Sequence, residues 1–351
     1  MDAQLTHATK SLSKTLTHLE QIREQNQIML SRSSELLEKI DSLATNGGEA
    51  APKHDAPVNG TPQPGLAEDS FEALVKDAVD NGNMSQVVQL LRSAAELRIA
   101  VESASDTTTL SPTRPKTFTH GPKSPHLVFM CTSVFSSGVH NYKRIAASFD
   151  GVRTVSAVPL PGFYRGTALP DSPEAAVESL AQIVAELVGD EPFTLAGQSS
   201  GGKFAYALAK HFESAGNSNL TGVALLDTHN GSDYANNVGG TAELLTREIL
   251  IDAYRKANGT APYHTARLTA MATWTDMLPS LYEGPLETDV LFVQCSKPWV
   301  VPYAGGDLQY PPAKPWPPSH TVRTLPVDHI SILVDGAELT AQILEEWING
   351  D

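Results

Sequence analysis

The chain has 351 residues, 41% of them hydrophobic and 19% charged, which suits a globular protein with one large domain and extensions. Its formal net charge of −15 argues against a nucleic-acid partner or an anionic membrane surface. No apolar run approaches the roughly 18 residues of a membrane span, and no signal peptide is evident. Cys131 and Cys295 form neither a disulfide framework nor a zinc motif, so we expect reduced core thiols in a cytoplasmic protein.

The N-terminal segment, residues 1–45, has the pattern of a coiled coil. Residues 3–45 contain neither glycine nor proline, and seam positions recur every seven residues. One column of the seam consists of Leu5, Leu12, Leu19, Asn26, Ser33 and Ile40. Asn26 in the seam favours two strands in register. The alternative is a single amphipathic helix packed on its own domain. Residues 46–68, rich in Gly, Ala and Pro, are predicted to be a flexible linker.

A helical hairpin is predicted for residues 69–100. A first apolar stripe ends at Asn81-Gly82-Asn83, and a second helix runs from Met84 to Leu97. The Ser/Thr/Pro-rich residues 102–125 are expected to be irregular.

Strands and helices then alternate to the end of the chain, which predicts a mostly parallel sheet covered by helices on both faces. The expected strands are Leu127–Cys131, Thr154–Val158, Phe193–Ala196, Gly222–Leu226, Val290–Gln294 and Thr321–Leu325. The expected helices are Tyr142–Phe149, Pro173–Leu187, Lys203–Ala215 and Gly336–Ile348. Residues 231–285 interrupt this alternation with helical material, which we expect to form a lid over the carboxyl ends of the strands.

The most informative motif is Gly197-Gln198-Ser199-Ser200-Gly201, which reads G-x-S-x-G between an apolar strand and a helix. That context is typical of a nucleophile elbow, a sharp turn that presents the serine hydroxyl at the sheet edge. The alternative is a Gly/Ser turn that opens an ordinary helix. We therefore predict Ser199 to be a catalytic nucleophile.

A serine nucleophile requires a base and an acid that orients it, in the chain order Ser, acid, His for this kind of fold. His329 follows the strand Thr321–Leu325 and precedes the last helix, where the base is expected, whereas His320 lies at the wrong end of that strand. His229 and His264 fall in the lid region. Asp227 ends the strand Gly222–Leu226 and is predicted to be the acid.

Asp328 is a poor alternative acid, because its sequence neighbour His329 leaves it little room to bridge back to the imidazole. The oxyanion hole needs main-chain N–H donors from the residue after the nucleophile and from the loop after the first core strand. Ser200 is predicted to supply the first, and Ser133 or Val134 the second.

From about residue 69 onward the chain resembles the terminal thioesterase domain of modular type I polyketide synthases. The similarity lies in the nucleophile segment, the turn Val158–Phe163, Leu225-Leu226-Asp227-Thr228, Asp328-His329, and the segment Ser137–Tyr142. The hairpin resembles the helices that pair two such domains, and residues 1–45 are similar to coiled-coil docking segments of these synthases. The family commonly has His where this chain has Gln198.

The resemblance implies that residues 69–351 form an α/β-hydrolase fold with a helical lid. It also implies that the protein is a thioesterase that releases an acyl chain from an acyl carrier protein. It implies an acyl-serine intermediate resolved by hydrolysis or macrolactonisation. No cofactor of its own is expected, because phosphopantetheine belongs to the carrier protein. The implied partners are that carrier protein, an upstream synthase subunit docked at the N-terminal helix, and a second copy of the chain.

Three other functions remain open on sequence grounds. A free-standing editing thioesterase would have little need of a coiled coil. A non-catalytic docking or assembly module would have little need of Ser199, Asp227 and His329. A generic carboxylesterase is the third.

Overall fold

The computed structural model describes residues 74–75, 77–78, 81, 83–104, 113–134, 138–164, 166–230, 265–301, 308–316 and 321–350. The predicted coiled coil, the linker 46–68 and the lid residues 231–264 lie outside the described residues. The chain divides into two units, Met1–Gln63 and Pro64–Asp351. All the described residues belong to the second unit.

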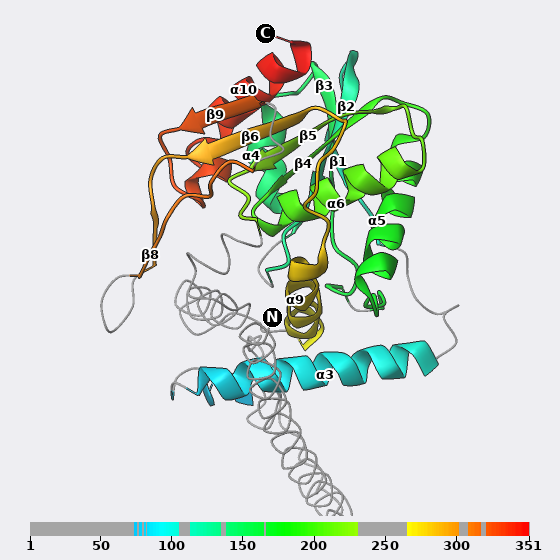
Figure 1. The fold of residues 1–351 in the computed structure, drawn as a ribbon, viewed down its shortest axis with the longest axis vertical. Helices are drawn as coiled ribbons and strands as arrows, with labels where there is room; N and C mark the ends of the chain where they lie inside the picture. The colour runs from blue at the N-terminus through cyan, green and yellow to red at the C-terminus, as the bar shows by residue number, and fades with distance from the viewer. Residues whose placement is uncertain are drawn as a thin grey trace, which may run out of the picture. The chain divides into compact units, whose positions relative to one another are not determined.

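The centre of this unit is a seven-stranded sheet in the order β1-β3-β2-β4-β5-β6-β9 (Figure 1). Its strands are β1 (Lys116–Thr119), β2 (Lys123–Met130), β3 (Arg153–Val158), β4 (Phe193–Gln198), β5 (Leu220–Leu226), β6 (Val290–Cys295) and β9 (Thr321–Leu325). All neighbours pair in parallel except β1, which runs antiparallel to β3. The predicted mostly parallel sheet is confirmed, and with the helices on its faces this is an α/β-hydrolase fold.

Helices cover both faces of the sheet because alternate strand residues point to opposite sides and are apolar on each. The helices α5 (Pro173–Val188) and α6 (Ser200–Ser214) share one core cluster with Val128 and Leu195. The helices α4 (Lys143–Ala147) and α10 (Ala337–Asn349) share the opposite cluster with Leu127 and Phe129. Ser172 caps α5 by accepting a hydrogen bond from the Ala175 N–H at 3.2 Å.

Two further helices pack against each other and join the core of α5 and α6. They are α3 (Met84–Ala104) and α9 (Thr265–Met277), which lie next to each other below the sheet in Figure 1. Arg98 of α3 bonds the Ala266 carbonyl of α9 and the Gly162 carbonyl after β3, both at 2.9 Å. The predicted second hairpin helix and the predicted lid helix are therefore in contact.

The sequence-based expectation that residues 102–125 are irregular is wrong in three places. Helix α3 continues to Ala104, β1 forms the sheet edge, and β2 begins at Lys123. β1 is four residues long and contributes only one fully buried side chain, so its sequence carries little hydrophobic signal. Short edge strands of this kind are stabilised by pairing with a neighbour, here β3.

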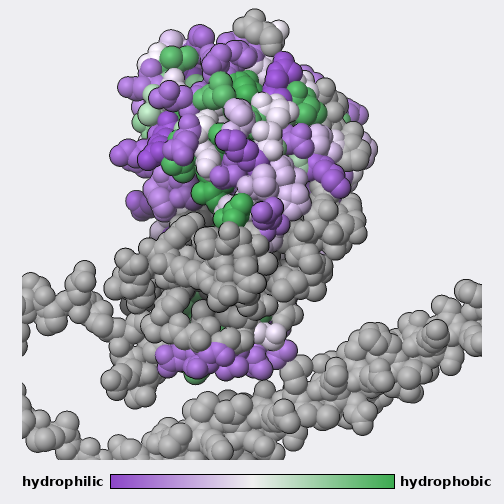
Figure 2. Space-filling model, turned by 90° about the vertical axis from the view of Figure 1, so that its left-hand side faces the viewer, coloured by the Kyte–Doolittle hydropathy of each residue, from purple (hydrophilic) through white to green (hydrophobic). Residues whose placement is uncertain are grey.

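The remaining elements are short. They are the 3₁₀ helices η2 (Val139–Tyr142), η3 (Leu278–Ser280) and η4 (Ser331–Leu333), and the antiparallel pair β7 (Trp299–Val301) and β8 (Leu308–Tyr310). Cys131 and Cys295 are buried free thiols, as expected. None of the described helices has the length and apolar character needed to cross a membrane. On the face drawn in Figure 2, the described residues mix hydrophilic and hydrophobic patches.

Candidate active site

Ser199 lies at the sharp turn between β4 and α6. Its backbone has φ 55° and ψ −130°, a left-handed conformation that costs energy for a residue with a Cβ. The turn is fixed to the neighbouring strand because the Ser199 N–H donates to the Leu226 carbonyl at 3.0 Å. Ser199 is partly exposed, whereas Gln198 and Ser200 beside it are buried. The structure therefore has the strained, accessible geometry that the motif predicts for a nucleophile elbow.

Glycines make this turn possible by allowing close backbone approach. A Cβ at Gly201 would collide with the Met130 carbonyl, and one at Gly197 would collide with the backbone of Gly201. A Cβ at Gly202 would collide with the Oγ1 of Thr228. The start of α6 thus sits directly against the ends of β2 and β5, and larger residues would push it away.

Asp227 follows β5 directly and is fully buried. It too has a positive φ, 46°, and its N–H donates to the Val293 carbonyl at 2.8 Å. The carboxylate oxygen Oδ1 accepts hydrogen bonds from the main-chain N–H groups of Cys295 at 3.1 Å and Ala313 at 3.2 Å. These bonds hold the carboxylate in one orientation, with Oδ2 left for another partner.

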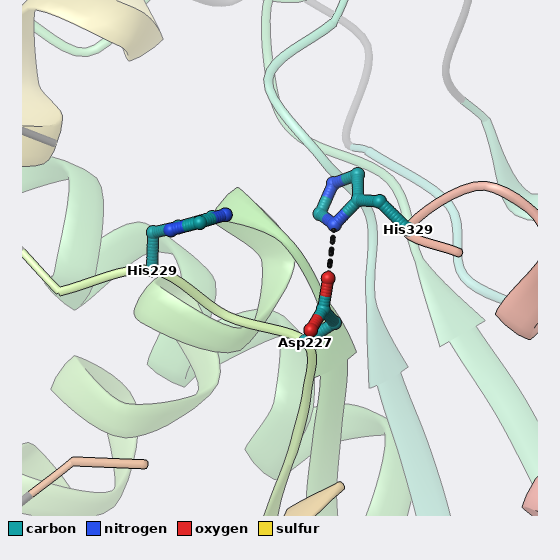
Figure 3. A group of neighbouring side chains, drawn as sticks. All are labelled: Asp227, His229 and His329. Carbon is teal, nitrogen blue, oxygen red and sulfur yellow. Dashed lines mark hydrogen bonds and ion pairs between the residues drawn. The ribbon is translucent and has the colours of Figure 1, made fainter. Parts of the chain in front are cut away.

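His329 supplies that partner (Figure 3). Its Nδ1 lies 2.8 Å from Asp227 Oδ2, and its other ring nitrogen points away from the carboxylate. The His329 carbonyl accepts a hydrogen bond from the Gln198 side chain at 2.9 Å, which holds the histidine loop beside the elbow. The ring of Trp299 lies 5.9 Å from the imidazole, centroid to centroid. The structure therefore brings Ser199, Asp227 and His329 to one edge of the sheet.

The electrostatics keep Asp227 ionised. Burial alone would raise the pKa of its carboxyl, but the hydrogen bond and electrostatic attraction from the His329 ring and the Cys295 N–H outweigh burial and hold the pKa below its ordinary value. An ionised acid on Nδ1 fixes the tautomer in which Nε2 is free to accept a proton. Asp328 makes a different set of contacts, capping the N–H groups of Ile330 and Ser331, each at 2.9 Å.

The predicted oxyanion donors lie together but are not equally available. Ser200 is the first residue of α6, where a main-chain N–H has no partner within the helix. The Ser133 N–H donates to the Ser200 side-chain oxygen at 2.9 Å, so that donor is occupied. Within the described part of the chain, no hydrogen bond involves the Val134 N–H. The hydroxyl of Thr275 in α9 donates to Ser133 Oγ at 3.4 Å, which ties the lid helix to this loop.

Sequence reasoning missed two residues at this site. His229 was assigned to the lid region, but it lies buried beside the pair, with its ring centroid 6.0 Å from that of His329. Its position two residues after Asp227 was the available signal. Gln198 was noted only as a departure from the family pattern, whereas its amide supports the His329 loop. His264 and His320 lie outside the described residues.

Several known proteins are similar to this chain in sequence. Polyketide synthase GfsE of Streptomyces halstedii is 30% identical over 284 residues, covering 80% of this chain and 7% of that protein. Erythronolide synthase EryA3 of Saccharopolyspora erythraea is 31% identical over 236 residues, covering 66% of this chain and 7% of that protein. The chain thus spans a small part of the length of these relatives.

Among solved structures, the type II thioesterase BorB from the borrelidin biosynthetic cluster is similar with a TM-score of 0.48 and 22% identity. That match covers 68% of this chain and 98% of that one. The family described as the thioesterase domain matches residues 127–348, which contain β2 from Leu127, the strands β3, β4, β5, β6 and β9, and the residues Ser199, Asp227 and His329. The chain belongs to the thioesterase domain family.

Proposed function

We propose that the chain releases a polyketide acyl chain from an acyl carrier protein through an acyl-Ser199 intermediate. The observation that carries the proposal is the strained turn at Ser199 at the same sheet edge as the Asp227–His329 hydrogen bond. Membership of the thioesterase family supplies the reaction class, and the similarity to polyketide synthases supplies the substrate class.

In the first half-reaction, His329 Nε2 accepts the proton of the Ser199 hydroxyl as its oxygen attacks the thioester carbonyl. The carbonyl oxygen becomes an oxyanion that the Ser200 and Val134 N–H groups stabilise, since the Ser133 N–H already donates to Ser200 Oγ. The carbon–sulfur bond then breaks, and the protonated His329 gives its proton to the phosphopantetheine thiolate. Asp227 stabilises the transient imidazolium without taking its proton.

In the second half-reaction, His329 removes a proton from water or from a hydroxyl of the acyl chain. The resulting oxygen attacks the acyl-Ser199 ester, and the serine leaves with the proton from His329. Water yields an acid and an internal hydroxyl yields a lactone, so the outcome depends on which nucleophile the site admits. Phosphopantetheine acts as a part of the substrate, and the proposal needs no cofactor of the chain's own.

We also propose that α3 contributes to a homodimer. Leu90, Leu97 and Val101 are 36%, 66% and 57% exposed and fall at spacings of seven and four on one side of the helix. A second copy would cover these side chains. The coiled-coil segment 1–45 is proposed to dock an upstream synthase subunit, which would raise the effective concentration of its carrier protein.

The test is a set of initial rates with one acyl group presented in three ways: on a holo acyl carrier protein, on free pantetheine and as a simple ethyl ester. A chain-releasing thioesterase should have its highest kcat/KM with the carrier-bound thioester. Highest activity on the ethyl ester would indicate a carboxylesterase. The carrier-bound assay is then repeated with an acetyl group and with a long acyl group, and a preference for acetyl would indicate an editing thioesterase. No turnover of any substrate would indicate a non-catalytic assembly module.

The dimer and docking proposals are tested by deleting residues 1–64. Light scattering should still give a dimer, and the rate with free acyl pantetheine should be unchanged, whereas the rate with the cognate upstream subunit should fall. A monomer after deletion would place dimerisation in the coiled coil. An unchanged rate with the upstream subunit would exclude docking by residues 1–45.

A further inference from the structure

The proposed reaction gives His229 no step, yet its side chain faces the two residues that activate the nucleophile. It is 9% exposed, and its ring plane meets that of His329 at 48°. Figure 3 shows the imidazole of His229 extending toward the space beside Asp227 and His329. Two imidazoles and one carboxylate therefore lie close together.

The distances among these groups suit a metal ion. One ligand atom from each of Asp227, His229 and His329 lies within 4.8 Å of the other two. An ion placed centrally among three such atoms lies no more than 4.8/√3, about 2.8 Å, from each of them. Zinc bonds to imidazole nitrogen and carboxylate oxygen are roughly 2.0–2.2 Å long, so inward movements of about 0.7 Å would complete all three.

The kinds of ligand select zinc over the commoner hard cations. Imidazole and carboxylate are zinc ligands, whereas Ca²⁺ and Mg²⁺ need six or more oxygen atoms, of which this group offers one carboxylate. The other oxygen of Asp227 is already fixed by the N–H groups of Cys295 and Ala313. Outer hydrogen bonds of this kind orient a ligating carboxylate. Three protein ligands leave the fourth position for water.

We propose that Asp227, His229 and His329 form a reversible Zn²⁺ site and that Zn²⁺ bound there inhibits the enzyme. If His329 binds through Nε2, the metal takes the lone pair that accepts the proton of Ser199. If it binds through Nδ1, the ring proton moves to Nε2 and occupies the same lone pair. Either way His329 cannot act as the base. The inhibitory effect rests on the proposed function, whereas the binding site does not.

Binding is tested by titrating the full-length metal-free protein with ZnCl₂ in a calorimeter and with CoCl₂ in a spectrophotometer, since four-coordinate Co²⁺ absorbs strongly in the visible range. We expect one ion per chain and an intense Co²⁺ band. His229→Phe should weaken Zn²⁺ binding by at least tenfold and abolish the band. His211→Phe, which alters a half-exposed histidine on α6, should bind both metals like the native chain.

X-ray absorption on the native protein with one equivalent of Zn²⁺ identifies the ligands without a variant, so it tests the site even if His229→Phe misfolds. Its spectrum should contain imidazole scattering and no sulfur ligand. Sulfur ligation, absence of binding at about 100 µM Zn²⁺, or equal binding by a folded His229→Phe protein would overturn the site. Neither readout requires turnover, so an inactive enzyme would refute the proposed function without affecting this test. Zn²⁺ binding without inhibition would refute the inhibitory role.

Discussion

Arg98 offers the sharpest test of how α3 supports the site. Its guanidinium donates to Glu102 at 2.7 Å within α3 and to the carbonyls of Gly162, Thr167 and Ala266, each at 2.9 Å. It thereby joins α3, the loop after β3 and the lid helix α9. Its side chain is only 16% exposed.

Arg98→Ala removes these charge-assisted bonds, each worth about 1.5–3 kcal/mol, and leaves carbonyls without that donor. Because such losses are not additive, we expect a total of about 3–4 kcal/mol in the free energy of unfolding. Arg92→Ala is the matched control, since Arg92 also bridges α3 to α9, through Asp276 at 2.8 Å, but those side chains are 36% and 41% exposed. An exposed pair of this kind contributes about 1 kcal/mol.

Urea unfolding at pH 7 measures both variants against the native chain. Arg98 should stabilise the fold more than Arg92 because it is more buried and bonds to backbone carbonyls. If Arg92→Ala lowers the free energy of unfolding as much as Arg98→Ala or more, this reasoning is refuted. Because Thr275 of α9 contacts Ser133 in the proposed oxyanion loop, Arg98→Ala should also lower kcat for acyl pantetheine more than it raises KM.

Three further predictions concern the elbow and the sheet. Ser200→Ala frees the Ser133 N–H and keeps the main-chain N–H of residue 200 as a donor. The acylation rate, measured by stopped flow, should therefore stay within about threefold of the native rate. A hundredfold lower rate would assign the Ser200 hydroxyl a direct role. Gly202→Ala places a Cβ against Thr228 Oγ1 and should cost about 1–3 kcal/mol by urea unfolding, and an unchanged midpoint would show that α6 has room there. Burial opposes the charge on Glu345, but its partners Arg153 and Lys123 lower the pKa of its carboxyl from 4.5 to about 2. The ionised carboxylate therefore stabilises the fold at pH values above its ordinary pKa. This stabilisation is lost as the pH falls toward 2. Glu345→Gln should therefore cost at most about 3 kcal/mol at pH 7, with the difference from native shrinking below pH 5; a constant difference down to pH 4 would contradict this assignment.

The central strands were predictable because their sequences are apolar on both sides. Val290–Cys295 lies within one residue of the expected segment. The edge strand Thr321–Leu325 also matches its expected segment, although most of its side chains are exposed. Alternation with helices predicted the mostly parallel sheet but not the order of its strands. The edge strand Lys116–Thr119 escaped prediction because pairing with β3, rather than its own hydrophobic pattern, stabilises it.

The positions of the three candidate catalytic residues relative to the sheet were predictable, whereas their catalytic roles stay predictions. The motif around Ser199, and the places of Asp227 and His329 after their strands, placed three side chains at one sheet edge, and the structure brings them there. The contact between Ser200 Oγ and the Ser133 N–H was beyond sequence reasoning, because it depends on a hydroxyl orientation in the folded loop. The inward direction of His229 likewise depends on the loop after Asp227.

The most direct test of the account is the mass of the protein after brief incubation with an acyl pantetheine thioester. We predict a gain equal to one acyl group, mapped by peptide sequencing to Ser199 and absent from Ser199→Ala. Asp227→Asn should acquire the same adduct about 10²–10⁴-fold more slowly, because its imidazole is no longer held in the productive tautomer. An adduct on any other residue, or undiminished acylation of Ser199→Ala, would contradict the proposed mechanism.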